Sequence, residues 1–219
     1  MTYVCWAALY EGNSDRAYFN VLIPRVIENL LFTEGVRNSL VTMSPTVELG
    51  RKGRSVEAVA AEACEAKDAF HLVVIHADTG GRAQNENLAA RSVQYCEAMS
   101  ARCNWPEQRC VVMTPSHEME AWALADPLAI TSAFGYRGKS KDVGLPDNPK
   151  EAERLVDPKA ILSAAVQKIR GRRSPDRMEL LLPAIAQRQA IDSLRQSRSF
   201  LEFERKLRVG LSSLGCLPQ

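Results

Sequence analysis

Acidic side chains follow three of the apolar runs in this sequence, close to where each run ends. They are Glu11 and Asp15 after the first run, Asp78 after the second, and Glu118 and Glu120 after the third. Carboxylates gathered in one place repel one another unless a cation neutralises them, and a hard divalent cation with oxygen ligands does this. Mg²⁺ held by a few carboxylates, with waters and substrate phosphates as its other ligands, is the usual arrangement for phosphodiester chemistry. These residues therefore predict a metal site, provided that the fold brings the three segments together.

Each of these acidic residues also has a simpler explanation. A carboxylate in a loop, such as Glu11, is most often only solvated. Asp15 lies near the start of a predicted helix, where a negative charge complements the helix dipole, and the same holds for Glu118 and Glu120. Asp78 opens Asp-Thr-Gly-Gly, which is a good turn sequence without any chemistry. Their shared position after strands is what favours the metal site.

The elements that must position these residues alternate between two periodicities. Strands are predicted near 3–10, 40–49 (broken near Pro45), 71–76 and 109–113. Helices are predicted at 14–31 with Ser14 as its N-cap, at 55–67 opened by Ser55, at 85–102, and after Ser116. This alternation predicts an α/β fold with a mostly parallel sheet and helices on both faces. The carboxyl ends of parallel strands share one edge, so we expect the acidic residues there.

The pattern changes after a loop rich in Gly, Lys, Asp and Pro near 135–149. Asp157-Pro158 predicts the start of a helix, with Asp as the N-cap and Pro at the first helical position. Further helices are predicted at 176–196 and 198–211. We therefore predict an α/β domain over residues 1–135 and a helical extension packed on it over residues 136–219.

Charge is unevenly distributed, although the net charge is only +2. Residues 1–136 carry 11 Lys and Arg against 16 Asp and Glu, whereas residues 137–219 carry 17 against 10. Two loops gather basic side chains and predict contacts with nucleic-acid phosphates, with binding that weakens as salt rises. They hold Arg51, Lys52 and Arg54 in one loop, and Arg170, Arg172 and Arg173 in the other. The alternative in each case is an ordinary solvated loop. Aromatic residues make up only 6%, which argues against base stacking.

Composition bounds the protein class. With 219 residues, 46% hydrophobic and 25% charged, the chain resembles ordinary globular proteins. No apolar run approaches the roughly 18 residues of a membrane span, and the first residues lack the basic start of a signal peptide. We therefore expect a cytoplasmic protein with no membrane partner. The six cysteines form no C-x-x-C pair, so we expect thiols rather than disulfides or a zinc finger.

Three motifs resemble the Toprim superfamily, the catalytic domain of topoisomerases, primases and OLD-family nucleases. The segment E-G-N-S-D at 11–15 is similar to its E-G-x-[ST]-[DE] start, and V-I-H-A-D at 74–78 stands in the place of its D-x-D. The segment P-S-H-E-M-E-A-W-A-L-A-D at 115–126 is similar to the H-E-x-E-A-[WL]-x-x-A-D block of a small bacterial Toprim-like family of unknown function allied to OLD nucleases. Some members of that family are encoded beside an ATPase and serve in defence against phage. The resemblance spans roughly residues 3–135.

The resemblance implies a metal-dependent phosphodiesterase that cuts nucleic acid with Mg²⁺ or Mn²⁺. It assigns catalytic roles to Glu11, Asp78 and Glu120, and further metal-ligand roles to Asp15, Glu118 and His76. His76 departs from the superfamily, which usually has an aspartate there. Imidazole binds Mn²⁺ better than Mg²⁺, and one negative charge is lost, so this departure weakens Mg²⁺ binding. On a regular helix Glu118 and Glu120 would project about 200° apart, so both face one metal only if the helix begins late.

Three functions are consistent with these observations. The first is the metal-dependent nuclease, implied to work in phage defence with an ATPase encoded nearby. The second, favoured by His76, is a non-catalytic or latent Toprim-like subunit that acts by binding a partner ATPase. The third is a doubly wound nucleotide-binding protein, but the sequence has neither G-x-G-x-x-G nor G-x-x-x-x-G-K-[ST]. The motifs therefore favour the nuclease.

Overall fold

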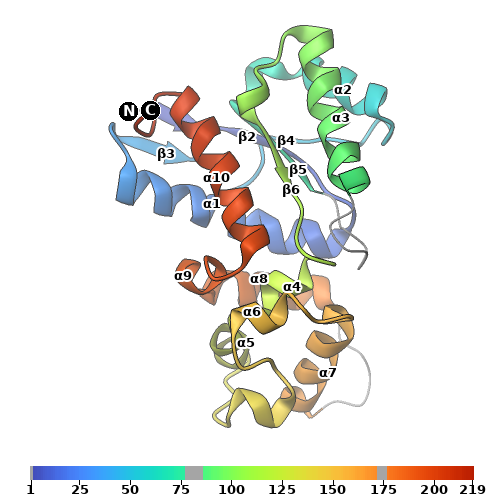
Figure 1. The fold of residues 1–219 in the computed structure, drawn as a ribbon, viewed down its shortest axis with the longest axis vertical. Helices are drawn as coiled ribbons and strands as arrows, with labels where there is room; N and C mark the ends of the chain where they lie inside the picture. Colours follow the sequence, from blue (N-terminus) through green and yellow to red (C-terminus); the bar gives the residue numbers. More distant parts are fainter. Residues whose placement is uncertain (1, 77–85, 172–176) are drawn as a thin grey trace.

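A computed structural model describes residues 2–76, 86–171 and 177–219 (Figure 1). Its strands are β1 (Thr2–Val4), β2 (Trp6–Leu9), β3 (Ser39–Val41), β4 (Val47–Glu48), β5 (Leu72–His76) and β6 (Cys110–Met113). Its helices are α1 (Asn13–Glu34), α2 (Val56–Glu65), α3 (Glu86–Cys103), α4 (Glu120–Leu124), α5 (Pro127–Ala133), α6 (Pro149–Ala152), α7 (Pro158–Arg170), α8 (Met178–Arg188), α9 (Ile191–Leu194) and α10 (Arg198–Ser213). Short 3₁₀ turns occupy Lys67–Ala69, Glu107–Arg109 and Ser140–Val143. The predicted α/β class, with a parallel sheet flanked by helices and a helical C-terminal part, is confirmed.

The main sheet has four parallel strands in the order β4-β2-β5-β6. In its register Ala8 pairs with Val74, and Val74 pairs with Val111. The two central strands, β2 and β5, are buried along their whole length. Strands covered on both faces need apolar side chains on both faces, which is why their sequences are continuous apolar runs.

The prediction of one sheet is wrong, because β1 and β3 form a separate two-stranded parallel sheet. The predicted strand at 3–10 divides at Cys5. There the backbone N–H of Cys5 donates to Nδ1 of His71 at 3.0 Å, and the Cys5 carbonyl accepts from the His71 N–H at 2.8 Å. The second predicted strand divides into β3 and β4 around Pro45, which has no N–H to donate to a neighbouring strand.

Helices cover both faces of the main sheet, as predicted. Along β2 and β5, alternate side chains point to opposite faces. Trp6 and Val74 belong to the apolar core shared with α1 and α10, whereas Ala7 and Val73 belong to the core shared with α2 and α3. Figure 1 shows α2 and α3 on one side of the sheet and α10 on the other. Both α3 and α10 contact the edge strand β6, and they cover this edge of the sheet from opposite faces.

The C-terminal helices pack back on the α/β part of the chain. Tyr18 of α1 donates its hydroxyl hydrogen bond to the side chain of Gln189, just after α8. Arg25 of α1 donates to the carbonyl oxygens of Ala186 and Gln189. These contacts hold α8 against α1, while α7 packs on α4. The two parts share one apolar core, and the boundary at residue 135 stays a prediction.

Two disulfides overturn the expectation of six thiols. Cys64 of α2 is bonded to Cys103 at the end of α3, and Cys96 of α3 is bonded to Cys110 of β6, with Cα–Cα distances of 5.9 and 5.7 Å. The bonded cysteines lie 39 and 14 residues apart in sequence. The packing of α3 against α2 and against β6 is what brings them together. Cys5 and Cys216 are free thiols.

Among the described helices, none has the length and apolar content needed to cross a membrane.

Candidate functional site

The loop between β2 and α1 positions Glu11 and Asp15 at the carboxyl edge of the sheet. Asp15 is the third residue of α1, and its Oδ2 accepts a hydrogen bond from the Gly12 N–H at 2.8 Å. The N-cap is therefore Gly12, and the prediction of Ser14 is wrong. A carboxylate at the third position of a helix reaches back to the capping N–H, and this contact fixes the Asp15 side chain. Asp15 is buried, whereas Glu11 is exposed.

His76 ends β5 beside this loop. β2 and β5 are adjacent and parallel, and Leu9 pairs with Ile75 in their register, so the residues that come after these two strands lie together. Nδ1 of His76 lies 3.9 Å from Oδ2 of Asp15, and the His76 side chain is fully buried. Its ring packs on Phe19 of α1, with ring centroids 4.7 Å apart. The structure thus brings together residues from the first two predicted motifs.

A cavity of about 320 Å³ opens at this edge of the sheet. Glu11 and His76 line it, together with Arg54 from the basic loop and polar side chains of α3. The α3 residues are Ser92, Gln94 and Tyr95. The Tyr95 hydroxyl donates to the Arg54 carbonyl at 2.9 Å, which ties the basic loop to α3. The sequence did not single out these α3 residues, because in sequence they are ordinary polar positions of an amphipathic helix.

The third motif lies near α1, but its residues do not line the cavity. α4 begins at Glu120, so Glu118 precedes the helix and the late start that would let both carboxylates face one metal is present. Glu120 is buried at 5% exposure. Burial raises the pKa of Tyr18 well above its usual range, and the nearby negative charges of Asp126 and Glu120 add to that rise. Glu120 therefore lies near α1. Trp122 packs edge-on against Phe19, with ring centroids 5.8 Å apart.

The donor chemistry at this edge fits a hard divalent cation in part. Glu11 and Asp15 offer carboxylate oxygens, and Mg²⁺ is commonly held by one or two carboxylates with waters and substrate phosphates. Among the residues that the structure describes, however, no three His, Cys, Asp or Glu side chains are grouped so as to hold a metal ion by themselves. Asp78, the remaining predicted ligand, lies outside the described residues. A cation here would therefore draw part of its coordination from groups beyond those described.

Of the predicted phosphate-binding residues in the first loop, two form ion pairs with nearby glutamates and one lines the cavity. Arg51 pairs with Glu48 at 3.2 Å, and Lys52 pairs with Glu65 at 2.6 Å, although both basic side chains are about two-thirds or more exposed. The hydrogen bond and charge of Glu65 raise the pKa of Lys52. Arg54 faces the candidate cavity. In the second cluster Arg170 is the last residue of α7, while Arg172 and Arg173 lie outside the described residues.

Glu153 is a half-buried hydrogen-bond acceptor that the sequence did not reveal. Its carboxylate accepts hydrogen bonds from the hydroxyls of Ser197 and Ser199, each at 2.6 Å, and from the backbone N–H groups of Arg198 and Ser199, each at 2.9 Å. Burial opposes ionisation, but these hydrogen bonds outweigh it and hold the pKa of Glu153 below its usual value. The Ser199 hydroxyl also accepts from Nε1 of Trp122 at 2.7 Å. Glu153 therefore holds the start of α10, and Ser199 links that start to α4, the helix that carries Glu120.

Comparisons of the chain with protein-family models, with curated proteins and with solved structures each found no match. The resemblance to Toprim proteins therefore rests on the motif residues alone and stays a prediction.

Proposed function

We propose that the protein is a metal-dependent nucleic-acid phosphodiesterase of the Toprim type. The observation that carries this proposal is the 3.9 Å approach of Asp15 to His76 beside a cavity lined by Glu11. In open parallel sheets, ligands bind in the crevice beyond the carboxyl ends of the strands. His76 ends β5, and Asp15 lies in the first turn of α1, which follows the neighbouring parallel strand β2. The charge of Arg54 at the same cavity suits a phosphate-bearing substrate.

In this proposal the chain's own residues hold the substrate and the attacking water. Arg54 binds a phosphate oxygen at the cavity. Glu11, the exposed carboxylate, accepts a proton from the water that attacks phosphorus, while the bond from phosphorus to one sugar oxygen breaks and that oxygen leaves with a proton from solvent. When bound, Mg²⁺ or Mn²⁺ supplies positive charge that polarises the phosphodiester and lowers the pKa of water. Of the predicted ligands, the neighbouring Asp15 and His76 would hold the cation, together with Asp78, which lies outside the described residues.

A nuclease assay tests this proposal. Purified protein is incubated with Mg²⁺ or Mn²⁺ and with duplex DNA, single-stranded DNA or tRNA. Glu11→Gln and Asp15→Asn should each lower the cleavage rate by about 100-fold or more, as expected when an acid–base or metal-binding group is lost. Asp68→Asn is the matched control, because Asp68 is exposed in the 3₁₀ turn that precedes β5, at the opposite end of the strand from His76. Wild-type protein that cleaves none of these substrates with either metal would contradict the proposal.

His76 favours a second candidate, a non-catalytic or latent subunit that binds an ATPase. A fully buried imidazole packed on Phe19 occupies the place where Toprim enzymes usually have a metal-binding aspartate. In this case the protein would act by binding a partner ATPase and would cut nothing on its own. Copurification with that ATPase, together with unchanged copurification of Glu11→Gln, distinguishes this candidate from the enzyme.

The proposed setting is the cytoplasm, with nucleic acid as the substrate and phage defence as the role. There the Cys64–Cys103 and Cys96–Cys110 pairs would meet reducing conditions. Both pairs attach α3, which lines the candidate cavity, to its neighbours. Expression of the protein alone and together with a candidate partner ATPase, followed by phage challenge, tests the proposed role.

A further inference from the structure

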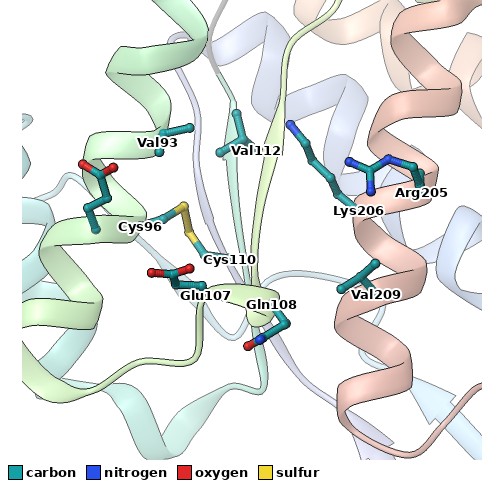
Figure 2. Close-up of a pocket in the computed structure, with 10 residues that line it drawn as sticks. Val93, Cys96, Glu107, Gln108, Cys110, Val112, Arg205, Lys206 and Val209 are labelled. Carbon is teal, nitrogen blue, oxygen red and sulfur yellow. A yellow bond between two sulfur atoms is a disulfide. The ribbon is translucent and has the colours of Figure 1, made fainter. Parts of the chain in front are cut away.

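A groove runs beside the outer edge of β6. β6 is the last strand in the sheet order, and among the described strands it pairs only with β5. Figure 2 shows α3 on one side of β6 and α10 on the other. The hollow between them has a volume of about 360 Å³. This groove is separate from the candidate site, and its ability to bind a ligand does not depend on nuclease activity.

The groove has an apolar base and walls of opposite charge. Val112 of β6 lies at its base, while Val93 of α3 and Val209 of α10 are 39% and 42% exposed beside it. Glu97 of α3 lines the groove. Figure 2 shows the acidic Glu107 on the α3 side and the basic Arg205 and Lys206 on the α10 side. Such a surface is suited to an extended peptide, because successive side chains of a strand point to opposite sides. Acidic side chains can then face one wall of the groove and basic ones the other.

The charges on the α10 side remain accessible. Arg205 pairs with Glu202 of the same helix at 2.8 Å, yet its side chain is 62% exposed. The Lys206 ammonium lies farther from Glu202, at 3.7 Å. Exposed pairs of this kind contribute little energy, so an incoming carboxylate competes with Glu202 at small cost.

The walls are fixed before anything binds. The Cys96–Cys110 disulfide attaches α3 to the first residue of β6. On the other side, Gly210 brings α10 so close that a Cβ there would lie 3.0 Å from the Gln108 carbonyl oxygen and 2.9 Å from the Leu72 side chain. A preformed groove binds with little loss of conformational entropy.

We propose that this groove binds an extended segment of a partner protein, which adds to β6 as a further strand. An edge strand presents unpaired N–H and C=O groups, and an added strand satisfies them. Side chains of the added strand alternate, so every second one faces α10 and the others face α3. The charges select acidic side chains toward Arg205 and Lys206, and basic or β-branched side chains toward Glu97 and Val93.

The same charges disfavour two other occupants. If β6 paired antiparallel with β6 of a second copy, the two-fold axis would set α10 against α10, and Arg205 and Lys206 would approach their own copies. A nucleic-acid strand would meet Glu97 and Glu107 on the α3 side, where its phosphates would be repelled. An extended peptide with the alternating pattern matches both sides.

Fluorescence anisotropy with a labelled peptide tests the proposal. The parent probe is Lys-Glu-Val-Glu-Lys-Val, capped at both ends, and a second probe exchanges Lys and Glu. We expect the parent to bind wild-type protein. The Arg205→Glu/Lys206→Glu variant should bind the parent probe at least tenfold more weakly than wild type does. It should bind the exchanged probe more tightly than the parent probe. Arg205→Gln/Lys206→Gln, which adds no repulsion to the helix, should give an intermediate loss. Circular dichroism checks that both variants stay folded.

Two N-methylated versions of the parent probe test strand addition itself. One carries N-methyl groups on the even amides and the other on the odd amides. Only alternate N–H groups of an added strand point at β6, so one version should lose at least tenfold in affinity while the other binds like the parent. No binding of the parent at 1 mM, or equal affinity of the two methylated versions, would overturn the proposal. Two further results would also overturn it. One is displacement of the probe by polyuridylate, and the other is a wild-type dimer that the Arg205→Glu/Lys206→Glu substitutions dissociate.

Discussion

Oδ2 of Asp15 lies 3.9 Å from Nδ1 of His76, and both side chains are buried at the carboxyl edge of the sheet. The pair joins the loop after β2 to the end of β5. An aspartate at position 76 would set two carboxylates against each other at this point. Buried like charges at such a separation are costly unless a cation lies between them. The identity of residue 76 therefore controls how much this edge depends on a metal.

The first prediction concerns His76→Asp. Without metal, this variant should be less stable than wild type, because its new carboxylate faces Asp15. Mg²⁺ should raise its melting temperature more than that of wild type, since binding to the folded state alone adds stability. Cleavage supported by Mg²⁺ should rise relative to cleavage supported by Mn²⁺, because imidazole is the softer ligand. Thermal unfolding with and without each metal, and the nuclease assay, measure these effects.

Asp78→Ala serves as the companion variant and should abolish cleavage with both metals. If wild type and His76→Asp respond equally to Mg²⁺ and Mn²⁺ in both assays, residue 76 does not contact the metal.

The second prediction concerns the basic cluster after α7. Reversal of Arg170, Arg172 and Arg173 to Glu should weaken nucleic-acid binding and flatten its dependence on salt. Each lost phosphate contact makes the negative slope of log K against log salt shallower by about 0.9 on duplex DNA. Binding isotherms at several salt concentrations measure the slope.

A variant with the same change in net charge provides the control for this cluster. Arg137, Lys139 and Lys141 are exposed and lie before α6, and their reversal to Glu should leave the slope nearly unchanged. An equal slope in the two triple variants would show that the cluster after α7 is an ordinary solvated loop.

The third prediction concerns the disulfides. They close loops of 39 and 14 residues, for which the chain-entropy argument gives about 4 and about 3 kcal/mol of stability. Reduction should therefore lower the urea midpoint, and Cys64→Ser/Cys103→Ser should lower it more than Cys96→Ser/Cys110→Ser. Thiol titration of the denatured, unreduced protein should find two thiols, Cys5 and Cys216. A count of six would show that the bonds do not form.

The fourth prediction concerns Glu153. Its depressed pKa means that the folded state favours the ionised carboxylate. The stability from this preference is fully present above the usual glutamate pKa of 4.5 and is lost as pH falls through the lower pKa of the folded state. Glu153→Gln should cost about 1–3 kcal/mol at pH 7, because hydrogen bonds from two hydroxyls and two N–H groups lose a charged acceptor.

The difference in unfolding free energy between wild type and Glu153→Gln should shrink below pH 4.5. Urea titrations from pH 7 to pH 3 measure it, with Asp68→Asn as the exposed-carboxylate control. A difference that stays constant across this range would mean that the Glu153 carboxylate is not held ionised by its partners.

Local sequence signals determined several elements by themselves. The aliphatic run at 72–75 indicated the central strand, because only a strand covered on both faces needs apolar side chains at consecutive positions. Ser55 and Asp157 were predicted to start helices, and their side chains accept from the N–H groups of Ala58 and Ala160. These interactions connect residues three apart, so the sequence alone contains both partners.

Only the tertiary structure decided the features that depend on distant partners. The Cys64–Cys103 bond and the bonds of Glu153 to the start of α10 join residues about 40 positions apart. The close approach of Asp15 and His76 arises from the pairing of β2 with β5. Sequence patterns report which face of an element is buried, whereas the partner on that face is chosen by the packing of the whole chain.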